Sequence, residues 1–312
     1  MINQEELKCD DPVSGNRILV SLISVCLAFI MCGCVLSPKK RMIKGSAIKF
    51  SEGTIISART RGPVSYDEFV ADLKEARFVY IGEIHNAKSH HDIQLKIIKE
   101  LYSYNPNIAV GMEMFDRTYQ QILNEWTEGS LDRKTFINKT HWYANWKYDF
   151  DLYSDIFEFL KENKIRIVGL NMPFHIPPKI ATGGIESLSG DEKKYLPEYI
   201  DTSSTIRKEY VEEVFKMHSI KGRDNFDNFY MTQSAWDETM AETAILNVKN
   251  DVMIVLAGNG HILRFGIPER VFARNKLPFR NVFLSPAGSS ADISYVDYIW
   301  VTAPLEKRIP NL

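Results

Sequence analysis

Cysteine is scarce in this chain of 312 residues, and all four cysteines lie within the first 34 positions. They are Cys9, Cys26, Cys32 and Cys34. From residue 35 onward the sequence therefore excludes disulfide bonds, thiolate metal sites and cysteine nucleophiles. The remaining length is enough to bury a core that needs no disulfides.

An excess of positive charge is also lacking. The 38 Lys and Arg residues are balanced by 40 Asp and Glu residues, which gives a net charge of −2. This balance excludes the strongly basic surface that is typical of nucleic-acid-binding proteins. Internal repeats and low-complexity segments are absent as well. The hydrophobic fraction of 45% and the charged fraction of 25% are those of an ordinary globular chain.

Long hydrophobic runs are limited to one, Ile18 to Met31, which has fourteen residues. This run is short for a transmembrane helix and has the length of a signal-peptide core. It leads into Met31-Cys32-Gly33-Cys34, where a small residue before Cys34 resembles a lipoprotein cleavage site. We expect residues 1–34 to be a signal peptide with this lipobox, Cys34 to be lipidated, and residues 35–47 to form a tether. An uncleaved membrane-anchoring helix is the alternative.

Lipidation of Cys34 predicts a membrane-anchored lipoprotein. Val35 follows the cysteine where an aspartate would signal retention in the inner membrane, so we expect the outer membrane. The folded domain would then lie in the periplasm or at the cell surface.

Short apolar runs, typical of strands covered on both faces, alternate with helical patterns along the rest of the chain. This alternation predicts an α/β fold with a largely parallel sheet flanked by helices. We expect a single domain at 48–312, with a smaller inserted helical subdomain at roughly 115–164 and 175–230. The predicted strands are Thr54–Ser57, Phe78–Ile81, Ile108–Met112, Ile165–Leu170, Val252–Ala257, Asn281–Leu284 and Tyr298–Thr302. The predicted helices are Ser65–Ala76, Ser89–Tyr104, Tyr119–Glu128, Asp151–Asn163, Ser204–Met217, Phe226–Val248 and Glu269–Lys276.

Polar side chains follow four of the predicted strands. Glu83 and His85, Glu113, Asn171, and His261 each come directly after a buried run. Because ligands bind at the carboxyl ends of strands in open α/β sheets, we expect these side chains to share one cleft.

Two of these strand exits have the same form, Gly-x-x-His, at Gly82–His85 and Gly258–His261. Glycine allows a tight turn, and the histidine is then aimed over the edge of the sheet. Two imidazoles with Glu83 and Glu113 form either a set of ligands for a divalent metal or an acid–base catalytic set. Simpler interpretations stay open: a histidine bonded to a loop carbonyl, Glu113 as a cap, and Asn171 as a turn residue.

Two helical segments add further polar groups to the expected cleft. His90 and His91 begin the helix after the first Gly-x-x-His turn, where a helix N-terminus favours a neutral imidazole. Four residues of the helix Phe226–Val248 share one face by their spacing of three and four. They are Gln233, Trp236, Asp237 and Met240.

The stretch His141 to Tyr153, HWYANWKYDFDLY, is unusually aromatic. It forms either the core of the helical region or a platform for a flat aromatic ligand. In the second case Tyr143, Tyr148 or Tyr153 could bind ferric iron, because tyrosine is an accepted axial ligand of haem.

Five segments, taken together, resemble the ChaN-type haem-binding lipoproteins of the Tiki/TraB and erythromycin-esterase-like superfamily. They are YIGEIHNAKSHHDIQLKIIKEL, GMEMFDR, LNMPFHI, QSAWDETMA and VLAGNGHI, within roughly residues 50 to 270. The matched positions are Glu83, His85, His90, His91, Glu113, Gln233, Trp236, Asp237 and His261.

The resemblance implies an α/β domain with a small helical domain that binds haem, two cofacial haems in a homodimer, and ligation of iron by tyrosine. It also implies a role in haem or iron uptake, with an outer-membrane haem receptor as partner. No quoted motif fixes the ligating tyrosine, so Tyr195, Tyr199 and Tyr210 stay open beside the three tyrosines of the aromatic stretch, and His90 and His91 are further haem-binding candidates.

Two functions therefore stand side by side. The first is a haem-binding lipoprotein. The second is a metal-dependent hydrolase in which His85 and His261 bind metal or activate water, and Glu83 or Glu113 acts as the base. The strand-end groups are more numerous than haem binding requires, so both functions could occupy different sites.

Overall fold

The apolar runs of the sequence form an eight-stranded sheet in the computed structural model, which describes residues 50–217, 225–249, 251–289 and 291–305. These residues belong to the second of the two units into which the chain divides, Met42–Leu312. The sheet order is β2-β1-β8-β7-β3-β6-β4-β5. The strands are β1 (Ile55–Ser57), β2 (Gly62–Val64), β3 (Phe78–Glu83), β4 (Ile108–Asp116), β5 (Arg166–Asn171), β6 (Val252–Gly258), β7 (Phe279–Pro286) and β8 (Tyr298–Thr302).

The sheet is parallel from β8 to β5 and antiparallel only where β1 pairs with β8 and β2. Each of the seven predicted strands is present, and the α/β prediction with a largely parallel sheet is confirmed. The strand that the sequence did not predict is β2, which contains Pro63 and pairs through one edge only. Proline has no backbone N–H to donate to a neighbouring strand, so within sheets it is found at edge strands such as this one.

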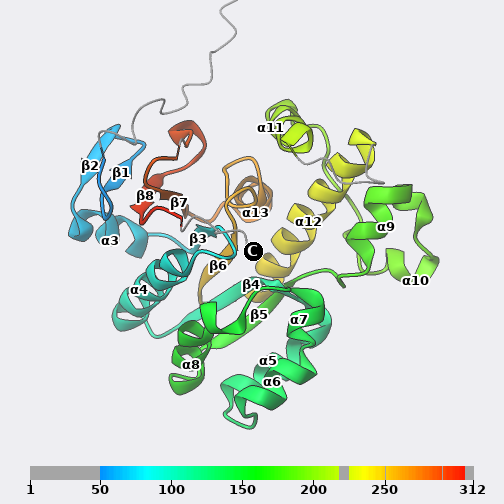
Figure 1. Cartoon of the computed structure of the whole chain (residues 1–312), viewed down its shortest axis with the longest axis horizontal. Helices are drawn as coiled ribbons and strands as arrows, with labels where there is room; N and C mark the ends of the chain where they lie inside the picture. The colour runs from blue at the N-terminus through cyan, green and yellow to red at the C-terminus, as the bar shows by residue number, and fades with distance from the viewer. Residues whose placement is uncertain (1–49, 218–224, 250, 290, 306–312) are drawn as a thin grey trace, which may run out of the picture. The chain divides into compact units, whose positions relative to one another are not determined.

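Helices cover both faces of the sheet, as Figure 1 shows for α4 and α12 on opposite sides of β3 and β6. Successive residues of β3 divide between two core clusters: Val79 and Ile81 pack with one, and Phe78 and Tyr80 with the other. On the first face lie α3 (Tyr66–Lys74), α4 (Lys88–Tyr104), α5 (Gln120–Thr127), α6 (Arg133–Lys139) and α8 (Ser154–Glu162). On the second face lie α12 (Phe226–Asn247) and α13 (Ile267–Asn275).

The two long insertions differ in how they bury apolar residues. In the first, Phe115, Trp126 and Phe157 belong to the same core cluster as the sheet. In the second, the apolar residues of α9 and α11 form two smaller clusters, both against the first half of α12. The remaining helices are α7 (Trp142–Asn145), α9 (Ile176–Gly183), α10 (Gly190–Lys193) and α11 (Thr205–Met217), with 3-10 turns η1 (Arg117–Tyr119), η2 (Phe150–Leu152), η3 (Ile185–Ser187) and η4 (Ile293–Tyr295). The division into a domain and a helical subdomain stays a prediction.

Local signals in the sequence explain where the helices begin. The predicted serine cap of α3 is present: Ser65 accepts from the amide of Glu68, and Glu68 accepts from the amide of Ser65. Such a reciprocal pair satisfies two backbone donors that a helix start leaves unpaired. Within the described ranges, none of the helices is both long enough and apolar enough to cross a bilayer.

Candidate functional site

The two Gly-x-x-His turns lie side by side because β3 and β6 are neighbours in the sheet. The parallel register places Gly82 beside Ala257 and Glu83 beside Gly258. The amide of Asn259 then donates to the carbonyl of Glu83 over 3.0 Å. Both histidines thus leave the carboxyl edge of the sheet from adjacent strands.

The glycines of the two motifs provide space for each other's side chains. A Cβ on Gly258 would lie 3.1 Å from Cε1 of His85, and a Cβ on Gly82 would lie 2.0 Å from Oδ1 of Asn259. Neither glycine has a positive φ. The glycines are therefore not required here by a positive φ; each one lets the opposite turn approach the strand.

The carboxylate of Glu83 is buried and fully engaged by donors. Its Oε1 accepts from His85 Nδ1 over 2.8 Å and from the hydroxyl of Tyr153 over 2.6 Å. Its Oε2 accepts from Gln94 Nε2 over 2.9 Å, and His91 Nδ1 lies 3.6 Å away. Burial raises the pKa of Glu83, but the His85 hydrogen bond, the charges of His91 and His85 and the Tyr153 hydrogen bond lower it from 4.5 to about 2. Glu83 is therefore ionised at neutral pH and orients its neighbours.

The imidazole of His85 lies between this anion and the solvent. Its side chain is 26% exposed, and its ring contacts the rings of Trp146 and Tyr148 at centroid distances of 4.6 and 5.2 Å. Burial lowers the pKa of His85, but the hydrogen bond to Glu83 and the charges of Glu113 and Glu83 outweigh it and raise the pKa above 6.5. His85 thus binds its carboxylate through Nδ1 and not through Nε2.

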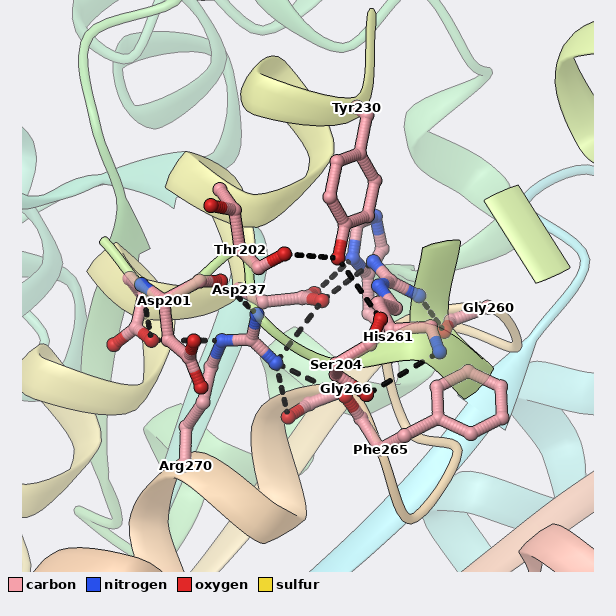
Figure 2. A network of polar contacts seen from close by, with 12 residues as sticks. Asp201, Thr202, Ser204, Tyr230, Asp237, Gly260, His261, Phe265, Gly266 and Arg270 are labelled. Carbon is pink, nitrogen blue, oxygen red and sulfur yellow. Dashed lines mark hydrogen bonds and ion pairs between the residues drawn. The ribbon is translucent and has the colours of Figure 1, made fainter. Parts of the chain in front are cut away.

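The second imidazole has a carboxylate partner of its own (Figure 2). Nδ1 of His261 lies 2.6 Å from Oδ1 of Asp237, which is fully buried. The other carboxylate oxygen lies 2.5 Å from Nη2 of Arg207, a buried side chain of α11. Burial raises the pKa of Asp237, but the charge of Arg207 and the bond to His261 outweigh it, so the pKa is lowered overall. An ionised Asp237 accepts Nδ1–H and leaves Nε2 of His261 as the free nitrogen.

Glu113 lies between the two imidazoles. It belongs to an irregular part of β4, where the register with β5 shifts between Met112 and Asp116. Its Oε2 accepts from the amide of Gly258 over 2.6 Å, and its Oε1 lies 3.6 Å from Nε2 of His261. Asn171 fixes this bulge by donating to the carbonyl of Glu113 over 3.0 Å. Glu113 thus has one carboxylate oxygen directed at an imidazole, whereas Glu83 has both committed.

His90 and His91 are buried and hold the first turn together. Nδ1 of His90 accepts from the amide of Ile84 over 2.9 Å, and its Nε2 lies 3.1 Å from the hydroxyl of Thr302. Burial and the charge of His91 lower the pKa of His90 to about 4, so this imidazole is neutral. Nε2 of His91 donates to the carbonyl of His85 over 3.2 Å. The partners of His90 and His91 named here are therefore groups of the protein itself.

The aromatic stretch divides between the core and the surface. Trp142, Trp146 and Tyr153 are buried, and the hydroxyl of Tyr153 donates to Glu83. Tyr143 is 54% exposed, and Tyr148 is partly buried beside His85. Of the more distant tyrosines, Tyr199 is exposed, whereas Tyr195 and Tyr210 are partly buried.

The predicted face of the helix Phe226–Val248 also divides. Asp237 bonds to His261, and the Trp236 ring lies 6.0 Å from the His261 ring. Met240 packs into the core under the sheet, and Gln233 is partly buried.

Sequence reasoning missed Arg207 and Gln94. Gln94 follows His91 by three residues on one helix, a spacing that could have indicated it. Arg207 has no comparable signal, because its partners Asp237 and Gly260 are distant in the sequence.

The predicted divalent metal finds no support. Within the part of the chain that the structure describes, no group of three or more His, Cys, Asp or Glu side chains is arranged to hold a metal ion. The predicted ligands were His85, His261, Glu83 and Glu113. Donors occupy both oxygens of Glu83, and the amide of Gly258 occupies one oxygen of Glu113.

Comparisons with known proteins agree with the sheet and its helices. The family model described as "Haem-binding uptake, Tiki superfamily, ChaN" matches residues 69–271. A search of curated proteins finds no match. A structure of Campylobacter jejuni ChaN with cofacial haem is similar at 21% identity and a TM-score of 0.65, over 79% of this chain and 95% of that one. The erythromycin esterase EreC is similar at 16% identity and a TM-score of 0.47, over 80% and 83% of the two chains.

The depressed pKa of Glu83 predicts a loss of stability in acid. A group whose pKa is lowered by folding stabilises the native state above its unfolded pKa and loses that contribution as pH falls toward the folded value. For Glu83 the window runs from 4.5 down to about 2. We expect wild-type protein to lose roughly 2 kcal/mol from this group between about pH 6 and about pH 3. The Glu83→Gln variant should lack this part of the pH dependence.

Urea denaturation at the two pH values measures the free energy of unfolding of both proteins. Subtracting the pH dependence of Glu83→Gln from that of wild type removes the contribution of the other acidic groups. Exposed Glu52 provides the control, since Glu52→Gln should keep the wild-type dependence. Parallel curves for wild type and Glu83→Gln would contradict the assignment.

Proposed function

Since this chain belongs to the haem-binding uptake family of the Tiki superfamily, ChaN, we propose that it is a lipid-anchored protein that binds haem for haem or iron uptake. When bound, haem would supply a ferric iron, which a tyrosine phenolate of the chain could ligate. Support from the residues comes from the surface of the aromatic stretch. Exposed Tyr143 and partly buried Tyr148 lie there with exposed His141 and Lys147. Aromatic side chains beside a cation fit a flat apolar ring that carries carboxylates.

Tyr148 is the tyrosine that we assign as the iron ligand. Tyr153 is unsuitable because its hydroxyl is buried and donates to Glu83, and burial followed by the charge of Glu83 raises its pKa well above 10.0. Tyr148 is partly buried beside the imidazole of His85, whose raised pKa favours the protonated ring, and a protonated ring would stabilise a phenolate beside it. Tyr143 on α7 is exposed. We propose that a second copy of the chain covers this surface, so that two haems are enclosed at a homodimer interface.

A haem titration of the full chain in detergent tests this proposal, with absorbance and sedimentation recorded together. We expect a saturable high-spin ferric spectrum and dimer formation linked to haem. Tyr148→Phe should lose that spectrum, because the phenolate is removed while the packing of the ring is kept. Tyr104→Phe is the matched control, since Tyr104 is 61% exposed at the far end of α4.

If Tyr148→Phe keeps the saturable ferric spectrum and Tyr143→Phe loses it, Tyr143 is the iron ligand instead of Tyr148. The absence of any saturable spectrum in wild-type protein would refute haem binding.

Hydrolysis at the strand-end cleft is the second proposal, and one observation favours it. Each of two neighbouring imidazoles is bound through Nδ1 to its own buried carboxylate, with Glu113 between them. A carboxylate that holds Nδ1–H in place leaves Nε2 as a base. In this proposal His261 activates water as a base, and Glu113 takes part in the second proton transfer. Glu83 only orients His85.

Replacement of His261 should therefore abolish any ester hydrolysis of the chain. Removal of a general base typically costs about 10²–10⁴-fold in rate. An activated aryl ester is a suitable probe, with metal content measured on the same sample to test the metal-dependent alternative. His175→Ala is the control, because the His175 side chain is 56% exposed and pairs with Glu192 at the surface. Equal rates for wild type, His261→Ala and His175→Ala would contradict hydrolysis at this cleft.

Anchoring through Cys34 stays a proposal, because Cys34 lies outside the described residues. We expect Cys34→Ser to prevent lipid attachment. The chain should then accumulate as uncleaved precursor and be lost from the outer-membrane fraction. Mass spectrometry of the N-terminal peptide and membrane fractionation measure both effects. Cys32→Ser is the matched control, since bulky Met31 precedes that cysteine. Lipid on the Cys34→Ser protein would contradict the assignment.

A further inference from the structure

Arg207 is a buried cation that contacts the second Gly-x-x-His turn from outside the motifs. It lies in the first turn of α11, and its side chain is 1% exposed. A buried guanidinium is expensive unless its charge is paired and its donors are bonded. The contacts of Arg207 therefore indicate its role in the structure.

The guanidinium joins the two parts of the structure that determine the position of His261. Nη1 donates to the carbonyl of Gly260, the residue before His261, over 3.1 Å. Nη2 lies 2.5 Å from Oδ2 of Asp237, whose other oxygen binds the imidazole. Figure 2 shows Gly260, His261 and Asp237 converging at this point from the loop and from α12. One side chain thus holds both the backbone that carries the ring and the carboxylate that orients it.

The shape of the side chain suits this bridge. A guanidinium presents several N–H groups in a rigid planar fork, so it can hold a carboxylate and a carbonyl at once. A lysine ammonium is a compact point charge on a flexible stem and does not reproduce that geometry.

Other contacts place α11 firmly against the same loop. Tyr210, one turn after Arg207, has its ring 5.3 Å from the ring of Phe265. Its hydroxyl lies 3.5 Å from where a Cβ on Gly260 would be. Val211 packs with Phe229 and Tyr230 of α12. The position of α11 and the position of the His261 loop are therefore linked.

A neighbouring ion-pair network reaches this bridge through Arg270 of α13, whose Nη1 lies 3.9 Å from Oδ2 of Asp237. Arg274 of α13 lies 2.5 Å from Glu238, which also lies 3.0 Å from Nε of Arg270. Arg274 and Arg207 are thus alike in pairing with a buried carboxylate of α12, but only Arg207 forms a close pair with Asp237.

We propose that Arg207 is a positioning residue for His261: by bridging Asp237 and the Gly260 carbonyl, it fixes the ring with Nδ1–H toward Asp237 and Nε2 toward Glu113. This inference rests on the hydrolase proposal for what the cleft does, but the arrangement itself is independent of any activity.

Nitrogen NMR of the imidazoles in the full chain, labelled at histidine, tests the proposal without ligand or substrate. The chain has seven histidines, and a His261→Gln spectrum identifies the resonance in question. In wild-type protein we expect a low-field, slowly exchanging Nδ1–H signal for His261. Arg207→Met should lose or shift that signal and leave the corresponding His85 signal in place.

Arg274→Met is the control, because it removes another arginine that pairs with a buried carboxylate of α12 and does not touch Asp237. It should leave the His261 signal unchanged. Arg207→Lys is the second variant, since it keeps the charge that Asp237 needs for folding but lacks the fork, so the signal should shift there too.

An unchanged His261 signal in either Arg207 variant that folds overturns the proposal, and so does an equal change in Arg274→Met. Unfolding of both Arg207 variants would also overturn it, because Arg207 would then be a general stabilising residue. Haem binding and ester hydrolysis are measured separately, so their failure would leave this result standing.

Discussion

The parallel pairing of β3 with β6 is the constraint on which the site depends. In this register Gly258 lies where His85 needs space, and Gly82 lies where Asn259 needs space. A shift of one residue would move every side chain of the strand to the opposite face of the sheet and place residues with a Cβ at these contacts. Neither motif can therefore adopt its observed position without the other.

Buried charge explains why so many elements surround the ends of β3 and β6. Removal of one partner from a buried ion pair leaves an uncompensated charge, which typically costs about 3–5 kcal/mol. Glu83 is compensated by donors from its own turn, from α4 and from Tyr153. Asp237 is compensated by a donor from the His261 loop and by the charge of Arg207 in α11. The helical insertions are thus part of the electrostatics of the site, since they supply the groups that keep both carboxylates ionised.

Features encoded locally could be predicted from the sequence. The seven predicted strands, the capped start of α3 and the chemistry at the strand ends follow from short-range patterns. The edge strand β2 was missed because Gly62 and Pro63 break a strand pattern, and only its place at an edge permits them. The roles of Arg207 and Tyr153 depend on contacts across many residues, and residue type alone does not reveal them. The close approach at Gly82 and Gly258 was missed for the same reason, because the crowding comes from the neighbouring strand.

Physical contact links the two proposed functions. The imidazole of His85 touches Trp146 and Tyr148 on one side and bonds to Glu83 on the other. A ligand bound at Tyr148 would therefore border the same imidazole that faces the cleft. Glu83 is saturated with donors and holds His85 in one orientation, whereas Glu113 keeps an oxygen directed at His261. The two halves of the site are thus unequal: His85 connects Glu83 to the aromatic residues Trp146 and Tyr148, and His261 with Glu113 is the part to which the hydrolase proposal gives the proton transfer.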